Sequence, residues 1–179
     1  MIYVFLANGF EEMEAMAPID CLRRAGKQVV TVAVGGAAIR SSHGMHVIPD
    51  LTEQEITLDD SLEMIVLPGG MPGTLNLGAD ETVVKTIKRF AAEGKLVAAI
   101  CAAPSVLGEN HILEGKKATC HPGFEEKLLG AQWLEQPVVV DGNVITSRGM
   151  GTAIAFALEL VRYFTDDATV EHIRQGLVY

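Results

Sequence analysis

The stretch Leu96-Val97-Ala98-Ala99-Ile100-Cys101-Ala102-Ala103-Pro104 decides the fold expected for this chain. Its five leading apolar residues are typical of a buried strand, and a proline after small residues is typical of a helix start. This is the layout of a nucleophile elbow, in which Cys101 stands at a strand-to-helix turn. Free N–H groups at such a helix start favour a thiolate and can bind an oxyanion. The same pattern also fits a cysteine packed in the core.

Strands and helices alternate on both sides of this stretch. The apolar patterns predict strands over 2–7, 28–34, 63–67 and 117–120, hairpins within 38–51 and 137–147, and helices over 11–25, 81–92, 124–129, 152–164 and 170–175. Such alternation predicts an α/β fold with a mostly parallel sheet and helices on both faces. Because these sheets bind ligands beyond the carboxyl ends of their strands, Asn8-Gly9, Pro68-Gly69-Gly70 and Cys101 are expected at one edge.

Length and composition restrict the class of protein. The 179 residues contain no linker-like segment, so one domain spanning residues 1–179 is expected. The hydrophobic content of 49% is spread over short segments that are too short to cross a bilayer. The segment from Met1 to Ala7 has no basic leader, so no signal peptide and a cytoplasmic location are expected.

Charge and cysteine usage point to small-molecule or protein partners. The net charge of −9 disfavours binding to nucleic acid or to anionic membranes. Cys21, Cys101 and Cys120 form an odd and widely spaced set without a CxxC pair, so reduced thiols are expected.

Carboxylates near the start of the first predicted helix are candidate partners for a thiol. Glu11 and Glu12 are explained by the helix dipole, which favours acidic residues in the first turn. Glu14 differs because it shares a helix face with Pro18 and Cys21 and therefore points inward. A carboxyl in an apolar cleft has a raised pKa and can donate a hydrogen bond to a thiolate.

A glycine turn follows the strand predicted over 63–67. Gly69-Gly70 allow close backbone approach, and an N–H group of this turn is expected to pair with that of Ala102 as an oxyanion hole. An ordinary glycine turn remains the alternative. A dinucleotide site is rejected because the glycine spacing is wrong and Pro72 interrupts it.

His121 is the most plausible basic partner because it lies in a loop between a strand and Pro122. The other four histidines have the character of surface or loop residues. Arg24 and Arg148 are weak candidates for binding substrate or an anion, since most arginines serve only as solvated surface groups. Cys120 beside His121 lacks a second pair of ligands, so no metal site is expected.

Taken together, these motifs resemble the ThiJ/PfpI superfamily, and within it the Parkinson-disease-associated deglycase branch and its bacterial relatives. The resemblance runs nearly end to end and is carried by residues 6–14, 66–70, 98–104, 120–122 and 146–152. It implies a flavodoxin-like three-layer sandwich, usually a homodimer, with Cys101 as the reactive cysteine and Glu14 as its protonated partner. It also implies oxyanion-binding amides at Gly70 and Ala102 and a nearby histidine at His121.

Departures from the family patterns narrow the activity. Ala102 stands where the protease-like members have a histidine after the cysteine, which disfavours a peptidase. No histidine is followed two residues later by glutamate, which disfavours a glutamine amidotransferase. Isonitrile hydratases carry aspartate at the position that matches Glu14, which counts against that activity.

The resemblance implies an enzyme that needs no cofactor. The expected activity is that of a glyoxalase or deglycase, a lyase or hydrolase type of reaction on methylglyoxal, glyoxal or their early adducts with amines and thiols. The alternative is an oxidative-stress sensor or chaperone in which Cys101 is oxidised without significant turnover.

Overall fold

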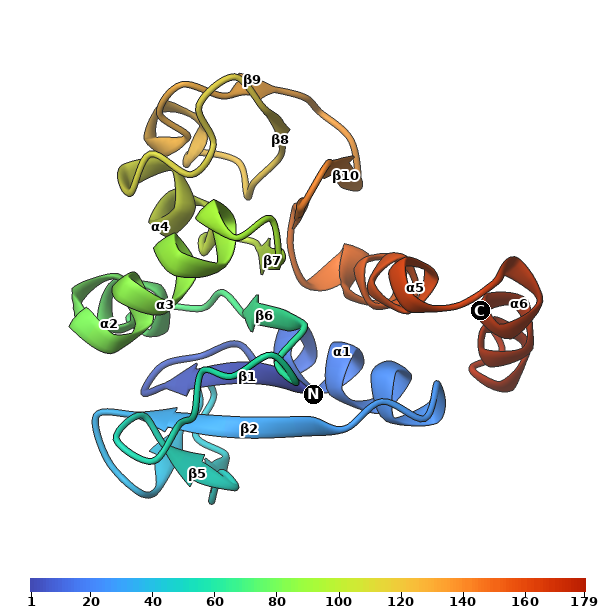
Figure 1. Ribbon diagram of the computed structural model, residues 1–179, viewed down its shortest axis with the longest axis horizontal. Helices are drawn as coiled ribbons and strands as arrows, with labels where there is room; N and C mark the ends of the chain where they lie inside the picture. Colours follow the sequence, from blue (N-terminus) through green and yellow to red (C-terminus); the bar gives the residue numbers. More distant parts are fainter.

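A seven-stranded sheet forms the centre of the computed structural model, which describes residues 1–179 (Figure 1). Its strand order is β10-β11-β7-β6-β1-β2-β5, and every neighbouring pair is parallel except β10 with β11. The strands are β1 (Ile2–Ala7), β2 (Val29–Val34), β5 (Leu51–Thr52), β6 (Met64–Leu67), β7 (Leu96–Ile100), β10 (Val138–Asp141) and β11 (Val144–Ser147). The expected mostly parallel α/β fold is confirmed.

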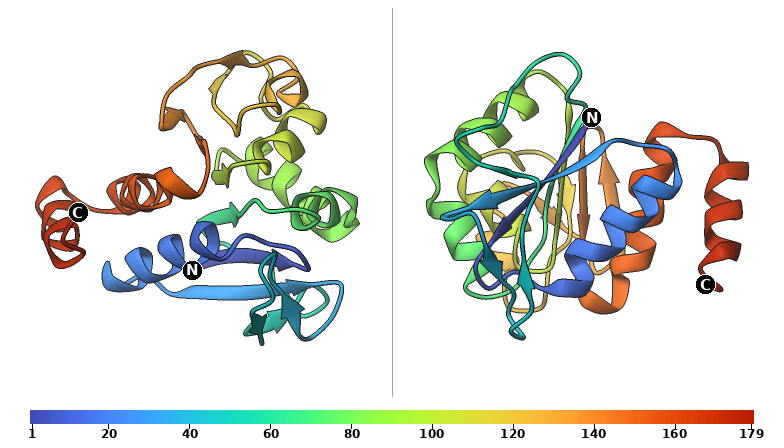
Figure 2. Two further views of the ribbon diagram at one scale, coloured as in Figure 1. Left: turned by 180° about the vertical axis from the view of Figure 1, so that it is seen from behind. Right: turned by 90° about the horizontal axis from the view of Figure 1, so that it is seen from below.

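Helices cover both faces of this sheet, as Figures 1 and 2 show. Helices α1 (Glu12–Arg24) and α5 (Ala153–Phe164) pack on one face, and α6 (Asp167–Gly176) packs against α5 on the side away from the sheet. Helices α2 (Gly73–Ala79), α3 (Glu81–Ala92) and α4 (Pro104–Glu109) pack on the other. Two large apolar clusters fill the spaces between the sheet and the helices, one on each face of the sheet. The central strands are buried on both faces because their successive residues point alternately into one cluster and the other.

Short elements complete the chain. A hairpin is formed by β3 (Ile39–Arg40) and β4 (His46–Val47), and a parallel pair by β8 (Lys117–Ala118) and β9 (Gln132–Trp133). Two 3-10 turns, η1 (Glu125–Lys127) and η2 (Met150–Thr152), precede β9 and α5. None of the helices combines the length and the apolar composition needed to cross a membrane.

The sequence pattern missed α2, β5 and β9. Helix α2 lies between two predicted segments and contains glycine at both Gly73 and Gly78, which weakens any helical signal. The two missed strands have two residues each, too few for a periodicity to be read. All the longer predicted elements are present with shifts of a few residues at their ends.

The strand order determines which loops lie together at the carboxyl edge of the sheet. Strand β6 lies between β1 and β7, so the carboxyl ends of these three strands are adjacent at one edge of the sheet. Asn8-Gly9, Gly69-Gly70 and Cys101 follow those ends directly. The predicted gathering of these segments is therefore confirmed.

Candidate active site

Cys101 occupies a strained turn between β7 and α4. Its φ of 66° lies in the left-handed region that residues other than glycine rarely adopt. The turn is held from both sides, because the Cys101 N–H donates to Ser147 O at 3.0 Å and the Cys101 carbonyl accepts from the His121 N–H at 2.8 Å. The half-buried side chain is thus presented by a rigid backbone, which agrees with the expected nucleophile elbow.

Two backbone amides approach the sulfur. The N–H groups of Ala102 and Gly70 lie near the sulfur and act to lower the pKa of Cys101. Gly70 has a φ of 92°, and a Cβ there would stand 2.4 Å from Glu11 N and 2.5 Å from Gly9 O. This position therefore requires glycine for both its conformation and its close approach to the loop after β1. The structure brings together the two amides expected from the sequence.

Glu14 is the buried acid of the site. Its side chain is 1% exposed, and Oε2 accepts a hydrogen bond from Gly69 N–H at 3.0 Å. The Met150 N–H also acts to lower the pKa of this carboxyl. Burial raises the pKa of Glu14 to about 7 and the charge of Glu11 adds to that rise, while hydrogen bonds from Cys101 and the two amides oppose it. Glu14 can therefore both hold and release a proton near neutral pH.

The thiol behaves differently from what the sequence predicts. Burial raises the pKa of Cys101 to about 12, and the charge and hydrogen bonding of Glu14 contribute to the rise. The amides of Ala102 and Gly70 pull the pKa down but do not outweigh these effects. The expectation that the helix start would make Cys101 a thiolate is therefore wrong while Glu14 is ionised. Because Cys101 and Glu14 are buried next to each other, a negative charge on one disfavours a negative charge on the other. One of the two groups therefore keeps its proton.

Gly69 lies between the side chains of Cys101 and Glu14. A Cβ at this position would lie 2.6 Å from Cys101 Cβ and 2.6 Å from Glu14 Oε2. Such distances are far inside van der Waals contact. The absence of a side chain at Gly69 is what allows the thiol and the carboxyl to meet.

The His121 side chain lies at the rim and makes no hydrogen bond with the side chain of Cys101 or Glu14. Its ring is exposed, Nδ1 lies 2.9 Å from Pro122 O, and the ring packs edge-on against Phe124. A Cβ on Gly149 would lie 3.5 Å from the His121 ring and 3.8 Å from Glu14 Oε1. The histidine and the acid therefore flank the same glycine without touching.

The two arginine candidates are placed differently. Arg148 follows Ser147, whose carbonyl accepts from Cys101 N–H, but its guanidinium pairs with Glu135 at 3.1 Å. Arg24 pairs with Asp20 at 2.6 Å at the far end of α1. Ten residues of helix separate it from Glu14, about 15 Å along the axis. Within the chain, Arg24 therefore lies away from Cys101 and Glu14, because the length of α1 separates them.

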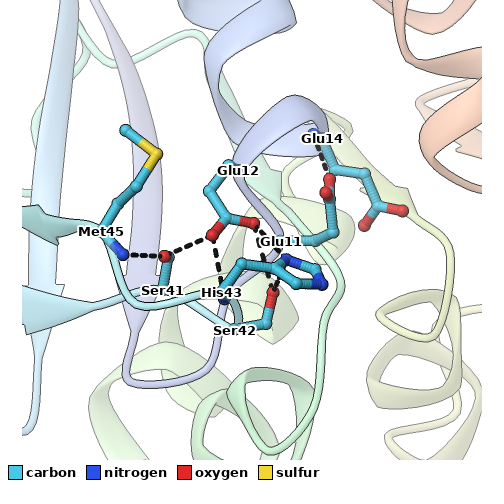
Figure 3. A network of polar contacts seen from close by, with 7 residues as sticks. All are labelled: Glu11, Glu12, Glu14, Ser41, Ser42, His43 and Met45. Carbon is cyan, nitrogen blue, oxygen red and sulfur yellow. Dashed lines mark hydrogen bonds and ion pairs between the residues drawn. The ribbon is translucent and has the colours of Figure 1, made fainter.

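Glu12 has a larger role than the helix-dipole interpretation gave it (Figure 3). Its carboxylate accepts hydrogen bonds from the Ser41 and Ser42 hydroxyls, from the His43 backbone N–H at 2.9 Å and from His43 Nδ1 at 2.9 Å. These bonds outweigh partial burial and lower the pKa of Glu12 to about 2. Glu12 thus fastens the loop between β3 and β4 to the first turn of α1.

Sequence reasoning treated Glu11 as an ordinary helix-start acid, and the structure agrees. Glu11 is the N-cap of α1, and its side chain accepts from Glu14 N–H at 2.8 Å. The Met150 amide was missed because nothing in the local sequence shows which backbone amide of the segment after β11 turns toward Glu14. The only sequence signal for a role of the segment after β11 was that residues 146–152 form one of the motifs that resemble the family.

Comparison with known proteins agrees with this geometry. The chain matches the model of the DJ-1/PfpI family over residues 1–163. It is 36% identical over 178 residues to Protein dj-1beta of Drosophila melanogaster, covering 98% of this chain and 95% of that protein. It is 33% identical over 164 residues to a protein of Pyrococcus abyssi named as a deglycase, covering 90% and 97%.

Solved structures show the same fold. A cysteine-to-alanine mutant of a DJ-1 superfamily protein from Salmonella typhimurium superposes with a TM-score of 0.93 at 36% sequence identity, covering 99% of this chain and 97% of the other. The nucleophile elbow, the buried glutamate beside it and these similarities together assign the chain to the DJ-1/PfpI family.

Proposed function

We propose that this protein is a cofactor-independent glyoxalase or deglycase that acts through Cys101 on methylglyoxal, glyoxal or their early adducts with amines and thiols. One observation carries the proposal. The Cys101 thiol lies near the amides of Gly70 and Ala102 and beside the buried Glu14 carboxyl, whose pKa is about 7. Such a carboxyl can accept and return protons at neutral pH. The relative named as a deglycase in Pyrococcus abyssi supports the same class of reaction.

In the first step Glu14 is the general base. As Cys101 Sγ attacks the aldehyde carbon, the thiol proton passes to the Glu14 carboxylate and the carbonyl electrons move to oxygen. The N–H groups of Gly70 and Ala102 stabilise this oxyanion, as in other oxyanion holes. Glu14 then returns its proton to the oxygen and leaves a neutral hemithioacetal.

In the second step Glu14 moves a proton within the adduct. It removes the proton from the former aldehyde carbon and delivers it to the adjacent carbon. The hydroxyl proton on the first carbon passes to the ketone oxygen, so the first carbon becomes a thioester carbonyl and the ketone becomes a hydroxyl. The aldehyde carbon is oxidised and the ketone carbon reduced by the same electron pair, so no external oxidant is required. Water then cleaves the thioester, which releases a 2-hydroxy acid and restores the Cys101 thiol.

His121 is assigned a secondary role in this scheme. Its ring and the Glu14 carboxyl both lie beside Gly149, and His121 can relay protons at the rim through water. Replacing His121 is therefore expected to slow turnover much less than replacing Glu14. Arg148, whose guanidinium is paired with Glu135, is expected to support the turn through its backbone rather than to bind substrate.

The test is lactate formation from methylglyoxal by the reduced protein, compared with Cys101→Ala and with Cys21→Ala as the matched cysteine control. We expect Cys101→Ala to abolish lactate formation. Cys21, buried on α1 away from the elbow, is expected to be dispensable for turnover. Lactate formation at the wild-type rate by Cys101→Ala would overturn the proposal.

The rival function is redox sensing at the same thiol. Under that function peroxide treatment creates a new binding activity while the reduced protein turns over no aldehyde. Measuring lactate with and without prior peroxide separates the two, since catalysis requires the reduced thiol and peroxide is expected to inhibit it.

A further inference from the structure

Arg40 differs from the other arginines of the chain. Its guanidinium has neither a carboxylate partner nor a hydrogen-bond acceptor in the structure, although the chain carries a net charge of −9. Each of the other six pairs with a carboxylate: Arg23, Arg24, Arg89, Arg148, Arg162 and Arg174. Arg40 is exposed at the end of β3, where it remains free to bind an anion from solution.

A cavity of about 300 Å³ lies beside this arginine. Its lining is Asn8, Gly9, Arg40, Ser41, Ser42, Met71 and Pro72. The Ser41 and Ser42 hydroxyls donate to Glu12 and are therefore occupied. Two of the lining residues have side-chain donors without a partner. One is Arg40, whose guanidinium lies beside Gly44 of the same hairpin. The other is Asn8, whose side-chain oxygen accepts from Arg40 N–H at 2.8 Å and so leaves Nδ2 unengaged.

The backbone that carries these donors is held in place. Gly9 N–H donates to Arg40 O at 2.8 Å, and Asn76 Nδ2 donates to Asn8 O at 2.8 Å. The bonds of Glu12 to the β3–β4 loop, seen in Figure 3, hold the hairpin against α1. They also compensate the Glu12 charge, which would otherwise repel an anion. A binding group on such a fixed loop loses little freedom when a ligand arrives.

The cavity lies within reach of the nucleophile. It is built on the loop after β1 and on Met71-Pro72, which directly follow the oxyanion amide of Gly70. A Cβ on Gly9 would lie 2.4 Å from Pro72 Cδ, so the two walls are in contact. Strands β1 and β7 are separated only by β6, which places the two strand ends about 10 Å apart at an inter-strand spacing of about 4.8 Å.

We propose that Arg40 and Asn8 form a subsite for the carboxylate of an aldehyde adduct whose reactive carbon is at Cys101. A guanidinium matches the two oxygens of a carboxylate, and an amide N–H supplies a third donor. In such an adduct the bond from Cys101 Sγ to the carbon forms as the carbon's bond to the carrier thiol or amine breaks, and the Cys101 proton passes through Glu14 to the departing carrier. The subsite gives a preference for adducts of carboxylate-bearing thiols or amines over neutral ones. This preference rests on the proposed function, whereas binding of the anion itself does not.

The kinetic test uses hemithioacetals of methylglyoxal with two thiols of equal length, mercaptohexanoate and mercaptohexanol. We expect wild type to favour the carboxylate adduct about five- to tenfold in kcat/KM, the effect of one or two charge-assisted hydrogen bonds. Arg40→Gln is expected to bring that ratio near one. Arg89→Gln, which alters an arginine paired with Glu93 at the end of α3, is the matched control and should leave both the ratio and kcat for methylglyoxal unchanged. A wild-type ratio near one, or an unchanged ratio in Arg40→Gln, would refute the subsite.

The binding test separates failure of the subsite from failure of the proposed function. Hexanoate, hexanol and inorganic phosphate are titrated into isotopically labelled protein, and the Asn8 Nδ2 and Arg40 Nε signals are followed. We expect only hexanoate to shift both signals in a saturable way and the shift of Asn8 to vanish in Arg40→Gln. If wild type turns over no aldehyde but hexanoate binds, the activity is wrong and the subsite stands. Binding of phosphate alone, or of no probe, contradicts the carboxylate assignment.

Discussion

Replacing Glu14 with glutamine is expected to make the stability of the protein less dependent on pH. The carboxyl is 1% exposed, and burial is the largest cause of the rise in its pKa from the ordinary 4.5 to about 7. Between these two values the unfolded chain loses the proton that the folded protein keeps. The free energy of unfolding therefore falls as pH rises from 4.5 to 7 and is constant above that range.

The size of the effect follows from the rise in pKa. At about 1.36 kcal/mol per pH unit, a rise from 4.5 to about 7 corresponds to about 3 kcal/mol. Glutamine keeps the shape and an oxygen for Gly69 N–H but does not titrate. The free energy of unfolding of Glu14→Gln minus that of wild type is therefore expected to increase by about 3 kcal/mol between pH 4.5 and pH 7.5.

Urea unfolding monitored by circular dichroism at half-unit steps from pH 4.5 to 8.5 measures this difference. With an m-value of about 2 kcal/mol/M, the midpoints are expected to separate by about 1.5 M across the range. Glu126→Gln, at an exposed carboxyl on η1, is the control and should follow wild type at every pH. A difference between Glu14→Gln and wild type that stays constant with pH would refute the reasoning, because only ionisation of the buried acid makes it vary.

Three further outcomes follow from the same geometry. The kcat/KM for methylglyoxal should rise with pH through an apparent pKa near 7, because Glu14 must be ionised to accept the thiol proton, and Glu14→Gln should lose about 10²–10⁴-fold at pH 8. Gly69→Ala places a Cβ 2.6 Å from Cys101 Cβ and from Glu14 Oε2, so it should abolish activity and lower the free energy of unfolding, measured by thermal unfolding, by about 1–3 kcal/mol. Gly176→Ala, whose Cβ would have nothing within 4 Å, is the control and should be neutral. Glu12→Gln should cost about 1–3 kcal/mol at pH 7 by urea unfolding, and because the pKa of Glu12 is lowered to about 2, its cost should shrink as pH falls from 4.5 toward 2. A Glu12→Gln loss that is equally large at pH 2.5 would contradict the ionic role of this clamp.

Local patterns were sufficient for most of the scaffold. The apolar run at Ile2–Ala7 matches β1 end to end, and the amphipathic period at Glu81–Ala92 matches α3, because both signals depend only on neighbours along the chain. Short elements such as β5 and β9 carry no such signal, since their pairing depends on strands that are distant in sequence.

The inward direction of Glu14 was also within reach of the sequence. Its spacing to Pro18 and Cys21 puts all three on one helix face, and all three are buried. The sequence could not show that Arg24, on the same helix, ends about 15 Å away from the site. Nor could it show that Glu12 fastens a hairpin that begins 27 residues later at Ile39.

The sequence by itself determined the elbow at Cys101, the glycine turn at Gly69-Gly70 and the inward face of Glu14, because each depends on residues within a few positions. Only the tertiary structure decided the protonation of the pair. The pKa of Cys101 is raised rather than lowered because folding buries it against Glu14, and the energy of an ionised group depends on the burial and charges around it in space. The same packing leaves Arg40 beside a cavity without an ion-pair partner. The lack of a partner depends on where the carboxylates lie in the folded protein, which the sequence does not show.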